Sequence, residues 1–380
     1  MKRFLRLFVP IMLLLCLVGC SIQTDIPPTP AIHPPLNTVK LNLVAAGDNL
    51  IHGPIYRQAR ERNEHGGFDF TAAYQPVAGL ISEADLAYIT QETPLGGTEL
   101  GLKSYPMFNS PQELGLHLID MGFNMISHAN NHVLDATSRG FNRTIEFWRA
   151  QDNVIMAGIA ANAADDQIRI LECNGLKIAL LAYTYGTNGL TLPASHPGIV
   201  KLIDDELMQN ELAEANELAD IVLVGIHWGV EYQKEPNDEQ RRLANLLAEG
   251  GADVIIGSHP HVLQTVELLT TTDSRTVPVF YSLGNFISAQ DKPATMLGGL
   301  AKVQMTYTLD TGLLQIDDMT VIPVVNDYTG HYDNITVYPL ADYTAEQAEN
   351  HGIRSKHPSF NREYLVQLYH ERIPAEYRTE

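Results

Sequence analysis

Two histidines separated by one residue, His259 and His261, are the part of the sequence best suited to chemistry. They close the stretch GSHPH at residues 257–261, which follows the apolar run at 254–256. A neutral imidazole offers a nitrogen lone pair near pH 7 and is a common metal ligand. On a turn that leaves a buried strand, both rings can face one cleft. The alternative is a polar loop with two surface histidines, so a metal site requires further ligands elsewhere in the chain.

Other polar side chains also follow apolar, strand-like runs, at 41–46, 86–89, 123–126 and 221–226. They belong to Asp48, Glu92, Asn131 with His132, and His227. In open α/β sheets, binding sites form outside the carboxyl ends of the strands. Mixed carboxylate and imidazole ligands suit zinc, manganese or iron better than calcium, and such ions activate water near neutral pH. The pattern predicts a site for one or two divalent transition-metal ions.

Each of these residues also has a structural interpretation. Asp48 could cap a helix, Glu92 could be a solvated loop residue, and Asn131 could be a turn residue. His227 could be a hydrogen-bonded core histidine, and we interpret His128 as structural. The joint occurrence of the set at successive strand ends favours the metal site.

The elements that must position these residues alternate between strands and helices. Amphipathic spacing predicts helices at 70–82, 111–121, 139–150, 204–218 and 238–247, and apolar runs predict further strands at 253–256 and 277–281. Asn174-Gly175 between two strand-like runs predicts a hairpin of 168–173 with 176–182. Residues 301–309 and 314–325 predict a closing hairpin. Residues 326–380 are Tyr-rich and polar, and we expect them to wrap the body or form a small helical appendage.

The N-terminus has the features of a bacterial lipoprotein. A basic start precedes an apolar run at 7–18, which is too short for a comfortable membrane span, and LVGC at 17–20 resembles a lipoprotein box. We therefore predict a signal peptide at 1–20, lipidation of Cys20 and an anchor on the outer face of the cell membrane. Residues 21–37 are Pro-rich and predict a semi-rigid linker before a body that begins near residue 38. An ordinary cleaved signal is the alternative.

Composition limits the partners and the source of stability. Cys16 leaves with the signal and Cys20 carries lipid, so Cys173 has no partner for an internal disulfide and stability must come from the core. The formal net charge is −20, and it becomes −23 once Lys2, Arg3 and Arg6 leave. This charge argues against nucleic acid as a partner.

Six motifs occur in a familiar order: GDN at 47–49, QETPL at 91–95, ANNHVLD at 129–135, HWGVE at 227–231, GSHPHV at 257–262 and YSLGNF at 281–286. Together they resemble the CapA family, bacterial proteins tied to poly-gamma-glutamate capsule synthesis and similar to calcineurin-like metallophosphoesterases. The resemblance covers residues 38–325. It implies a four-layer α/β/β/α sandwich with a metal cleft.

Carried over residue by residue, the resemblance implies these metal ligands: Asp48, Glu92, Asn131, His227, His259 and His261. Glu92 would lie between two metals, His132 would be the general acid, and Asp135 would orient it. By the same analogy Asn285, Trp228 and Glu231 are rim residues that bind substrate.

Two positions depart from the metallophosphoesterase pattern. That pattern has Asp-x-His at its first strand, whereas this chain has Leu50, so one ligand is missing and His52 is the candidate replacement. The family often has Asn two residues before the glutamate, where this chain has Thr90. One tight ion, or one tight and one weak, fits this set, and the half served by Asp48 and His261 is the incomplete one.

Three functions follow from the resemblance. The first is a metal-dependent hydrolase of phosphoesterase type that acts outside the membrane on an anionic surface polymer or a phosphoester. The second is a non-catalytic, metal-containing accessory lipoprotein of the poly-gamma-glutamate synthase and export complex. The third is a gamma-glutamyl amide hydrolase that trims the polymer.

Overall fold

The computed structural model describes residues 36–379, and of these residues 37–379 form one compact unit. The predicted signal peptide, Cys20 and the linker as far as residue 35 lie outside the described residues. Within the described part of the chain, no helix is long and apolar enough to cross a membrane.

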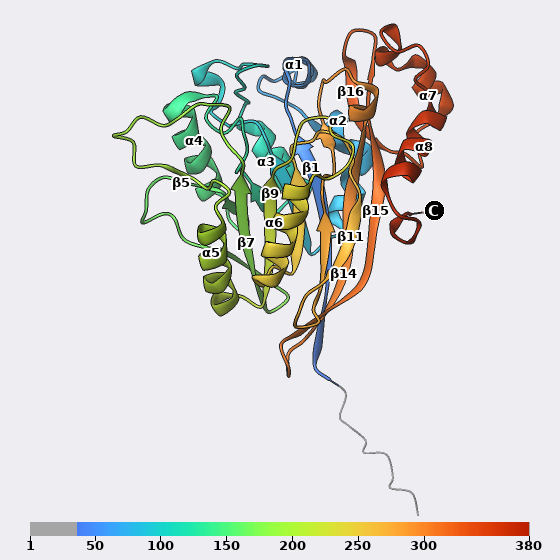
Figure 1. The fold of residues 1–380 in the computed structure, drawn as a ribbon. Coiled ribbons are helices and arrows are strands. Elements are labelled where there is room, and N and C mark those ends of the chain that lie inside the picture. Colours follow the sequence, from blue (N-terminus) through green and yellow to red (C-terminus); the bar gives the residue numbers. More distant parts are fainter. Residues whose placement is uncertain (1–35, 380) are drawn as a thin grey trace, which may run out of the picture. The chain divides into compact units, whose positions relative to one another are not determined.

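The first sheet has eight strands in the described residues (Figure 1). Its order is β16-β15-β14-β1-β2-β3-β4, and β13 pairs with β1. Strands β1 to β4 and β13 are parallel, whereas β14, β15 and β16 join antiparallel. The bounds are β1 Thr38–Asn49, β2 Leu86–Gln91, β3 Met125–Ser127, β4 Ile155–Ala157, β13 Asn285–Ile287, β14 Leu297–Thr308, β15 Leu313–Thr329 and β16 Asp333–Pro339.

The second sheet has the order β11-β12-β10-β9-β7-β6, with four parallel strands between two antiparallel edges. The β6–β7 hairpin confirms the turn predicted at Asn174-Gly175, where both residues have positive φ (51° and 83°). The bounds are β6 Arg169–Cys173, β7 Leu176–Thr184, β9 Ile221–His227, β10 Val254–Ser258, β11 Val266–Thr270 and β12 Thr276–Phe280. A separate pair joins β5 Ile159–Ala160 to β8 Ile199–Val200.

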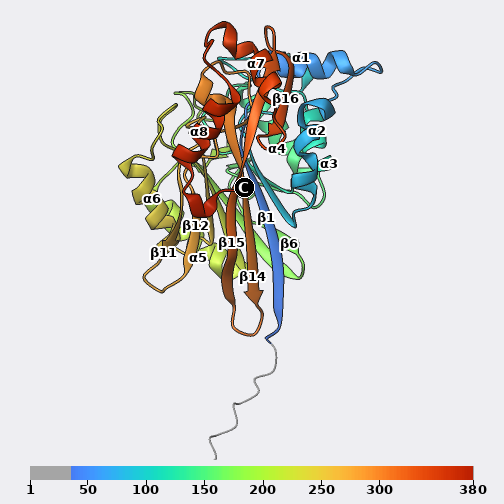
Figure 2. The same ribbon diagram turned by 90° about the vertical axis from the view of Figure 1, so that its right-hand side faces the viewer.

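The central strands of the second sheet are buried on both faces, and alternate residues enter different cores. In β7, Ile178 and Leu180 pack in the core shared with the first sheet, whereas Ala179 and Leu181 pack in the core shared with α5 and α6. The helices are α1 Gly53–Arg62, α2 Thr71–Ser82, α3 Glu113–Asp120, α4 Thr137–Arg149, α5 Asp205–Leu218 and α6 Asp238–Glu249. The predicted four-layer α/β/β/α sandwich is confirmed (Figures 1 and 2).

The first sheet extends beyond residue 325, where the sequence predicted the end of the domain. Strand β15 continues to Thr329, and β16 joins the same sheet, so the polar C-terminal segment begins as part of the body. The rest packs on β14 and β15, and the Tyr369 hydroxyl donates to the Val321 carbonyl at 2.7 Å. Its elements are α7 Ala345–Asn350, η3 Gly352–Ser355, α8 Arg362–Arg372 and η4 Ala375–Tyr377; earlier short helices are η1 Thr98–Leu100 and η2 Pro293–Met296.

Candidate metal centre

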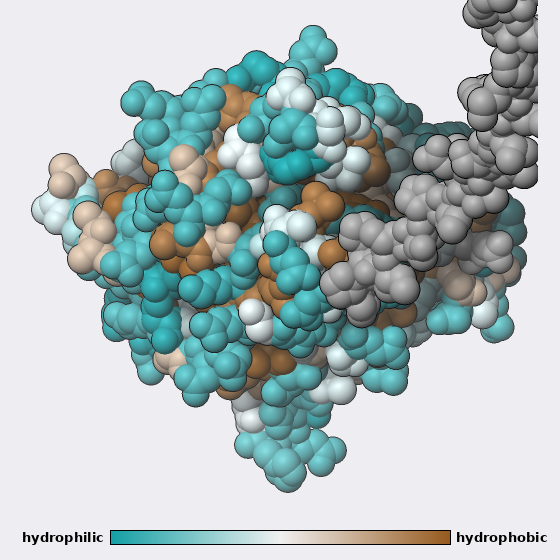
Figure 3. Space-filling model, turned by 90° about the horizontal axis from the view of Figure 1, so that it is seen from below, coloured by the Kyte–Doolittle hydropathy of each residue, from teal (hydrophilic) through white to brown (hydrophobic). Residues whose placement is uncertain are grey.

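The predicted ligands converge at the carboxyl ends of the parallel strands of both sheets, at the top of Figure 1. The first sheet supplies Asp48, Glu92 and Asn131 from the ends of β1, β2 and β3. The second supplies His227, the last residue of β9, and the histidine pair that follows β10. All six side chains are buried. Figure 3 shows the opposite end of the unit, where hydrophilic residues predominate.

Glu92 lies at the centre of this group without a hydrogen bond. Its Oε1 is 3.8 Å from Nε2 of His227 and 3.8 Å from Nε2 of His261, and neither carboxylate oxygen has a hydrogen-bond partner in the described residues. Burial raises the pKa of Glu92 well above its usual range, although His261 opposes the rise. A buried, unpaired carboxylate is costly unless a cation balances it. The position of Glu92 therefore fits a metal ion.

Asn285 sets the orientation of His261. The Asn285 amide nitrogen donates to Gln290 Oε1 at 2.9 Å and to the Thr295 carbonyl at 3.3 Å, which can only accept, so its Oδ1 faces His261 Nδ1 at 3.1 Å. Nδ1 then donates its proton to Asn285, and Nε2 is the nitrogen that faces Glu92. Burial lowers the pKa of His261, but Glu92 and Asp48 outweigh it and raise the pKa to about 9.

His227 and Asn131 face each other as ligands of one ion would. Nε2 of His227 is 3.0 Å from Asn131 Oδ1, and ligands in adjacent positions around one ion lie roughly 3 Å apart, given metal–ligand distances of about 2.1 Å. On the other side of the ring, Nδ1 is 2.9 Å from Ser258 Oγ, which can accept its proton. Burial lowers the pKa of His227 well below its usual range, which keeps the imidazole neutral.

His259 is held in an unusual backbone conformation, with φ of +97°. Its N–H donates to the Asp48 carboxylate at 3.2 and 3.3 Å, and its buried Nδ1 has no partner among the described residues. A positive φ in a non-glycine residue costs roughly 1–3 kcal/mol and persists where the surroundings enforce it. Burial lowers the pKa of His259 to about 3, so the ring is neutral and able to bind a metal.

His132 and Asp135 form the predicted acid pair at the edge of the centre. Nδ1 of His132 is 2.7 Å from Asp135 Oδ2, which also accepts the Phe108 N–H at 2.8 Å. The Phe108 ring lies edge-on to the imidazole, with centroids 4.8 Å apart. These contacts fix the tautomer and the plane of His132 and leave Nε2 as the nitrogen available for proton transfer.

Two of the three predicted rim residues, Asn285 and Trp228, are buried in the structure. Asn285 is buried and orients His261, as described above. Trp228 is 1 % exposed and packs in the core beneath α6, where its Nε1 donates to the Tyr281 carbonyl at 2.8 Å, a position that suits support of the site rather than contact with substrate. Glu231 is exposed beside the histidine pair, as expected of a residue at the rim.

His52 does not join the ligands in the described residues. Its Nδ1 accepts the Ala289 N–H at 3.1 Å, and its ring lies edge-on to Phe108 at 5.2 Å. Two groups of three side chains do have ligand atoms within 4.8 Å of one another: Asp48, Glu92 and His261, and Glu231, His259 and His261. The replacement predicted for the missing ligand at position 50 is therefore not part of either group.

Sequence reasoning missed several residues around the centre. The Tyr185 ring packs on His259, with centroids 4.5 Å apart, although this side chain is 47 % exposed. Asn188 accepts from Asn131 Nδ2 at 3.3 Å, and Ser258 supports His227. Tyr185 and Asn188 follow β7, and the polar stretch after that apolar run was the signal that could have located them.

The donor set fits one or two divalent cations. Buried atoms without partners, Glu92 Oε1 and Oε2 and His259 Nδ1, point into a group of carboxylates and imidazoles. His128 shows that missing partners alone are insufficient. Both its nitrogens are buried without partners, but its ring lies near Trp148 and it belongs to neither ligand group.

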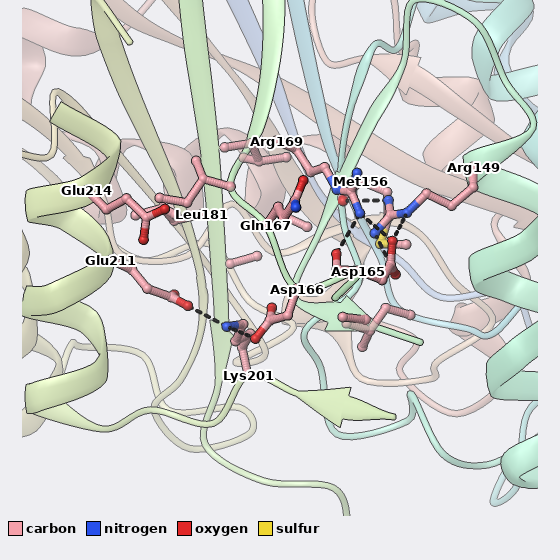
Figure 4. A pocket seen from close by; sticks show the side chains of 17 residues that line it. Arg149, Met156, Asp165, Asp166, Gln167, Arg169, Leu181, Lys201, Glu211 and Glu214 are labelled. Carbon is pink, nitrogen blue, oxygen red and sulfur yellow. Dashed lines mark hydrogen bonds and ion pairs between the residues drawn. The ribbon is translucent and has the colours of Figure 1, made fainter. Parts of the chain in front are cut away.

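A pocket lined by none of the six predicted ligands, drawn in Figure 4, contains charged residues of both signs. Lys201 pairs with Asp166 at 2.6 Å and with Glu211, and Arg149 and Arg169 both pair with Asp165, at 3.1 and 2.5 Å. Because the carboxylates named here are already paired with cations, we interpret this pocket as a structural ion-pair network.

The chain is similar to two curated relatives. It is 35% identical over 216 residues to the PGA biosynthesis protein CapA of Bacillus subtilis (strain 168), a match that spans 55% of each chain. It is 26% identical over 340 residues to the capsule biosynthesis protein CapA of Bacillus anthracis, spanning 85% of this chain and 79% of the relative. This chain thus spans about half the length of the first relative.

Two solved structures match at lower sequence identity. A novel phosphatase from Mycoplasma pneumoniae matches with a TM-score of 0.46 and 13% identity, over 76% of this chain and 94% of that one. A 5'-nucleotidase precursor from Thermus thermophilus matches with a TM-score of 0.45 and 11% identity, over 88% of this chain and 59% of that one.

The family assignment rests on the sequence match. The sequence model of the family described as bacterial capsule synthesis protein PGA_cap matches residues 42–290, which include all six predicted ligands. This match confirms the CapA resemblance, and the chain belongs to the bacterial capsule synthesis protein PGA_cap family.

Proposed function

We propose that this protein is a metal-dependent hydrolase of phosphoesterase type that takes part in the biosynthesis or handling of poly-gamma-glutamate. The observation that carries the proposal is the unpaired Glu92 carboxylate between His227 and His261. The His132–Asp135 pair beside it provides proton-transfer chemistry that a purely structural ion does not need. The polymer is proposed from the names of the two Bacillus relatives.

The chain's own residues suit hydrolysis of an ester or amide. A bound manganese, iron or zinc ion would supply Lewis acidity and activate water near neutral pH. Asp48, Glu92, Asn131, His227, His259 and His261 would hold one or two such ions. Asp135 holds the proton on Nδ1 of His132, so a second proton on Nε2 can pass to the leaving group.

We further propose that the protein works outside the cell, anchored by lipid on Cys20 to the outer face of the membrane. The apolar run at 7–18 that ends in Gly19-Cys20, and the Pro-rich stretch after it, support this location. The expected substrate is an anionic polymer or a phosphoester, and the expected partner is the poly-gamma-glutamate synthase complex.

An accessory role without catalysis is the second candidate. The relatives' names describe polymer biosynthesis and no reaction, and a metal ion could hold polymer carboxylates on a protein with a net charge of −20. A gamma-glutamyl amide hydrolase would use the same ligands and the same acid pair on a different bond.

Metal content measured together with activity tests these functions. The full-length chain, purified in detergent, is analysed for bound transition metal and assayed on a phosphodiester, a phosphomonoester and a gamma-glutamyl polymer. Asp48→Ala and His259→Ala should lose both metal and turnover, whereas His65→Ala, which changes an exposed histidine, should keep both. A wild-type chain that binds no metal contradicts the site. Metal without turnover on any substrate favours the accessory role.

A further inference from the structure

The two ligand groups contain three acidic side chains, and Glu231 is the exposed one. It is exposed, and its carboxylate lies within 4.8 Å of ligand nitrogens of His259 and His261, which are both buried. It lies in the loop after β9, between His227 and α6. An exposed carboxylate can act as a ligand only if its backbone is held in place. The contacts of this loop therefore decide whether Glu231 can serve as one.

Three hydrogen bonds fasten this loop to the histidine turn. The Trp228 N–H donates to the Ser258 carbonyl at 3.2 Å, and the Tyr232 N–H donates to the Pro260 carbonyl at 2.8 Å. Beyond them, Gln264 Nε2 donates to the Gln233 carbonyl at 2.8 Å. Pro260 lies between the two histidines, so the backbone next to Glu231 is bound to the turn that carries them.

Trp228 anchors the start of the same loop in the core. Its indole stacks on Tyr281, with centroids 5.8 Å apart, and Nε1 donates to the Tyr281 carbonyl. The chain then turns at Gly229, where φ is +78° and an added Cβ would lie 2.7 Å from the Gln240 side chain. Glu231 is thus presented from a rigid support, although its own side chain faces solvent.

The ligand count shows what Glu231 could supply. One half of the site has three protein ligands whose ligand atoms lie close to one another: Asp48, Glu92 and His261. First-row divalent ions usually take about four to six ligands. Because Nδ1 of His261 is bound by Asn285, Nε2 is the nitrogen left for an ion, and His261 belongs to the group of Glu231 as well.

We propose that Glu231 is a metal ligand where the two halves of the centre meet, beside His259 and His261, and that through His261 it completes the half formed with Asp48 and Glu92. The proposal rests on the proposed function, since it requires a metal at this place. Three carboxylates and one imidazole form an oxygen-rich set, which suits manganese better than zinc. The other half, with Asn131, His227 and His259, is richer in nitrogen and suits zinc or iron.

Manganese binding to the full-length chain tests this role without any assay of turnover. Free Mn²⁺ is followed by its paramagnetic resonance signal during titration of wild type, Glu231→Gln and Glu231→Asp. Glu231→Gln should bind at least one equivalent about 100-fold more weakly, because removal of an outer-shell partner alone costs 10–100-fold. Glu231→Asp keeps the carboxylate and should recover most of the affinity.

Glu235→Gln is the matched control, because it removes the same charge from an exposed glutamate four residues along, which pairs with Arg372 at 2.7 Å. It should bind manganese as wild type does. If Glu231→Gln binds manganese as tightly as wild type, the proposal is overturned and the proposed function still stands. The same conclusion follows if Glu235→Gln loses as much manganese affinity as Glu231→Gln, because the effect would then come from long-range charge. A wild-type chain that binds neither manganese nor zinc overturns the proposed function and this proposal with it.

Discussion

The metal centre and the C-terminal segment at 326–379 both bury histidines and carboxylates. Only at the metal centre does a group of neighbouring buried atoms lack hydrogen-bond partners. In the C-terminal segment, His351 accepts the Ile353 N–H on Nδ1 at 3.0 Å, and its Nε2 is 3.0 Å from the Asn326 carbonyl. Asp327 accepts the Tyr343 hydroxyl at 2.7 Å. At the metal centre, both oxygens of Glu92 lack partners. In the C-terminal segment, Asn326 Nδ2 is the single buried side-chain atom of the described residues without a partner, so no group of such atoms forms there. Isolated or bonded buried polar groups belong to the structure, whereas several unbonded groups that converge on one point indicate a ligand.

The backbones of the two regions differ in the same way. Helix α7 begins with a capping box between Thr344 and Gln347, and α8 begins with Asn361 accepting the Tyr364 N–H at 2.8 Å. Such caps stabilise a helix by about 1 kcal/mol each. At the metal centre, His259 and His261 both have positive φ, of 97° and 59°. The C-terminal segment follows local preferences, and the histidine turn departs from them to aim two rings.

The largest effect should come from the acid pair. His132→Ala should lower turnover about 1,000-fold, because general acid catalysis typically contributes 10²–10⁴-fold, while metal content stays at the wild-type level. Metal analysis and initial rates on the same preparation check this. His128→Ala, which removes a buried histidine outside both ligand groups, should leave turnover close to wild type. Loss of metal in His132→Ala would instead make His132 a ligand.

Glu92→Gln should separate function from stability at the centre. Loss of the carboxylate should weaken metal binding by about 100-fold or more. The metal-free variant should nevertheless be at least as stable at pH 8 as the wild type, since the burial that raises the pKa of Glu92 makes its ionised form costly. Metal titration and denaturant unfolding measure the two effects.

Glu211→Gln is the matched control for Glu92→Gln, because Glu211 is a carboxylate that already has partners. It pairs with Lys201 and accepts the Tyr183 hydroxyl at 2.8 Å. Its loss should destabilise the chain by roughly 1–2 kcal/mol and leave metal binding unchanged. A Glu92→Gln variant as destabilised as Glu211→Gln would contradict the difference drawn between the two regions.

The sequence allowed prediction of the sandwich and its ligand rim because apolar runs and the polar residues that follow them are local signals. Strand β2 ends beside Glu92, and His227 is the last residue of β9, close to where the runs at 86–89 and 221–226 placed them. Helix α1 was missed because Ile55 and Ala59 are the only buried side chains larger than glycine in a stretch rich in Arg.

The structure departs from the sequence predictions where tertiary contacts decide what a side chain does. Trp228 follows a ligand histidine, but its ring turns into the core because Tyr281 provides an apolar face and a carbonyl acceptor. The sequence placed the end of the sheet at 325 because Asn326 and Asp327 interrupt the apolar pattern of β15. Their polar groups are buried against His351 and Tyr343, which lie too far along the sequence for a local pattern to show.

His351 should make the C-terminal segment sensitive to acid. Burial lowers the pKa of His351 to about 4 from 6.5, so its stabilising contribution is full above pH 6.5 and is lost as pH falls through 4. Between pH 8 and pH 5 the loss should be about 2 kcal/mol, at 1.36 kcal/mol per unit. His351→Gln can keep both hydrogen bonds and does not titrate. Denaturant unfolding of the metal-free wild type and His351→Gln at both pH values isolates the effect, and parallel curves would contradict it.

The smallest effect should come from Asp327, and it has the opposite sign. Burial raises the pKa of Asp327 to about 6 from 3.8, so the protonated form is favoured in the fold. Its contribution is full below pH 3.8 and is lost as pH rises through 6, which leaves a buried carboxylate at pH 8. Asp327→Asn should therefore be more stable than wild type at pH 8 by about 1 kcal/mol, because the gain in desolvation exceeds the weaker bond from Tyr343. The difference should vanish near pH 4.

Metal affinity should not change, since Asp327 belongs to neither ligand group. A variant less stable than wild type at pH 8 would mean that the Tyr343 bond outweighs the burial of charge, and the C-terminal segment would then depend on ionised groups as the metal centre does.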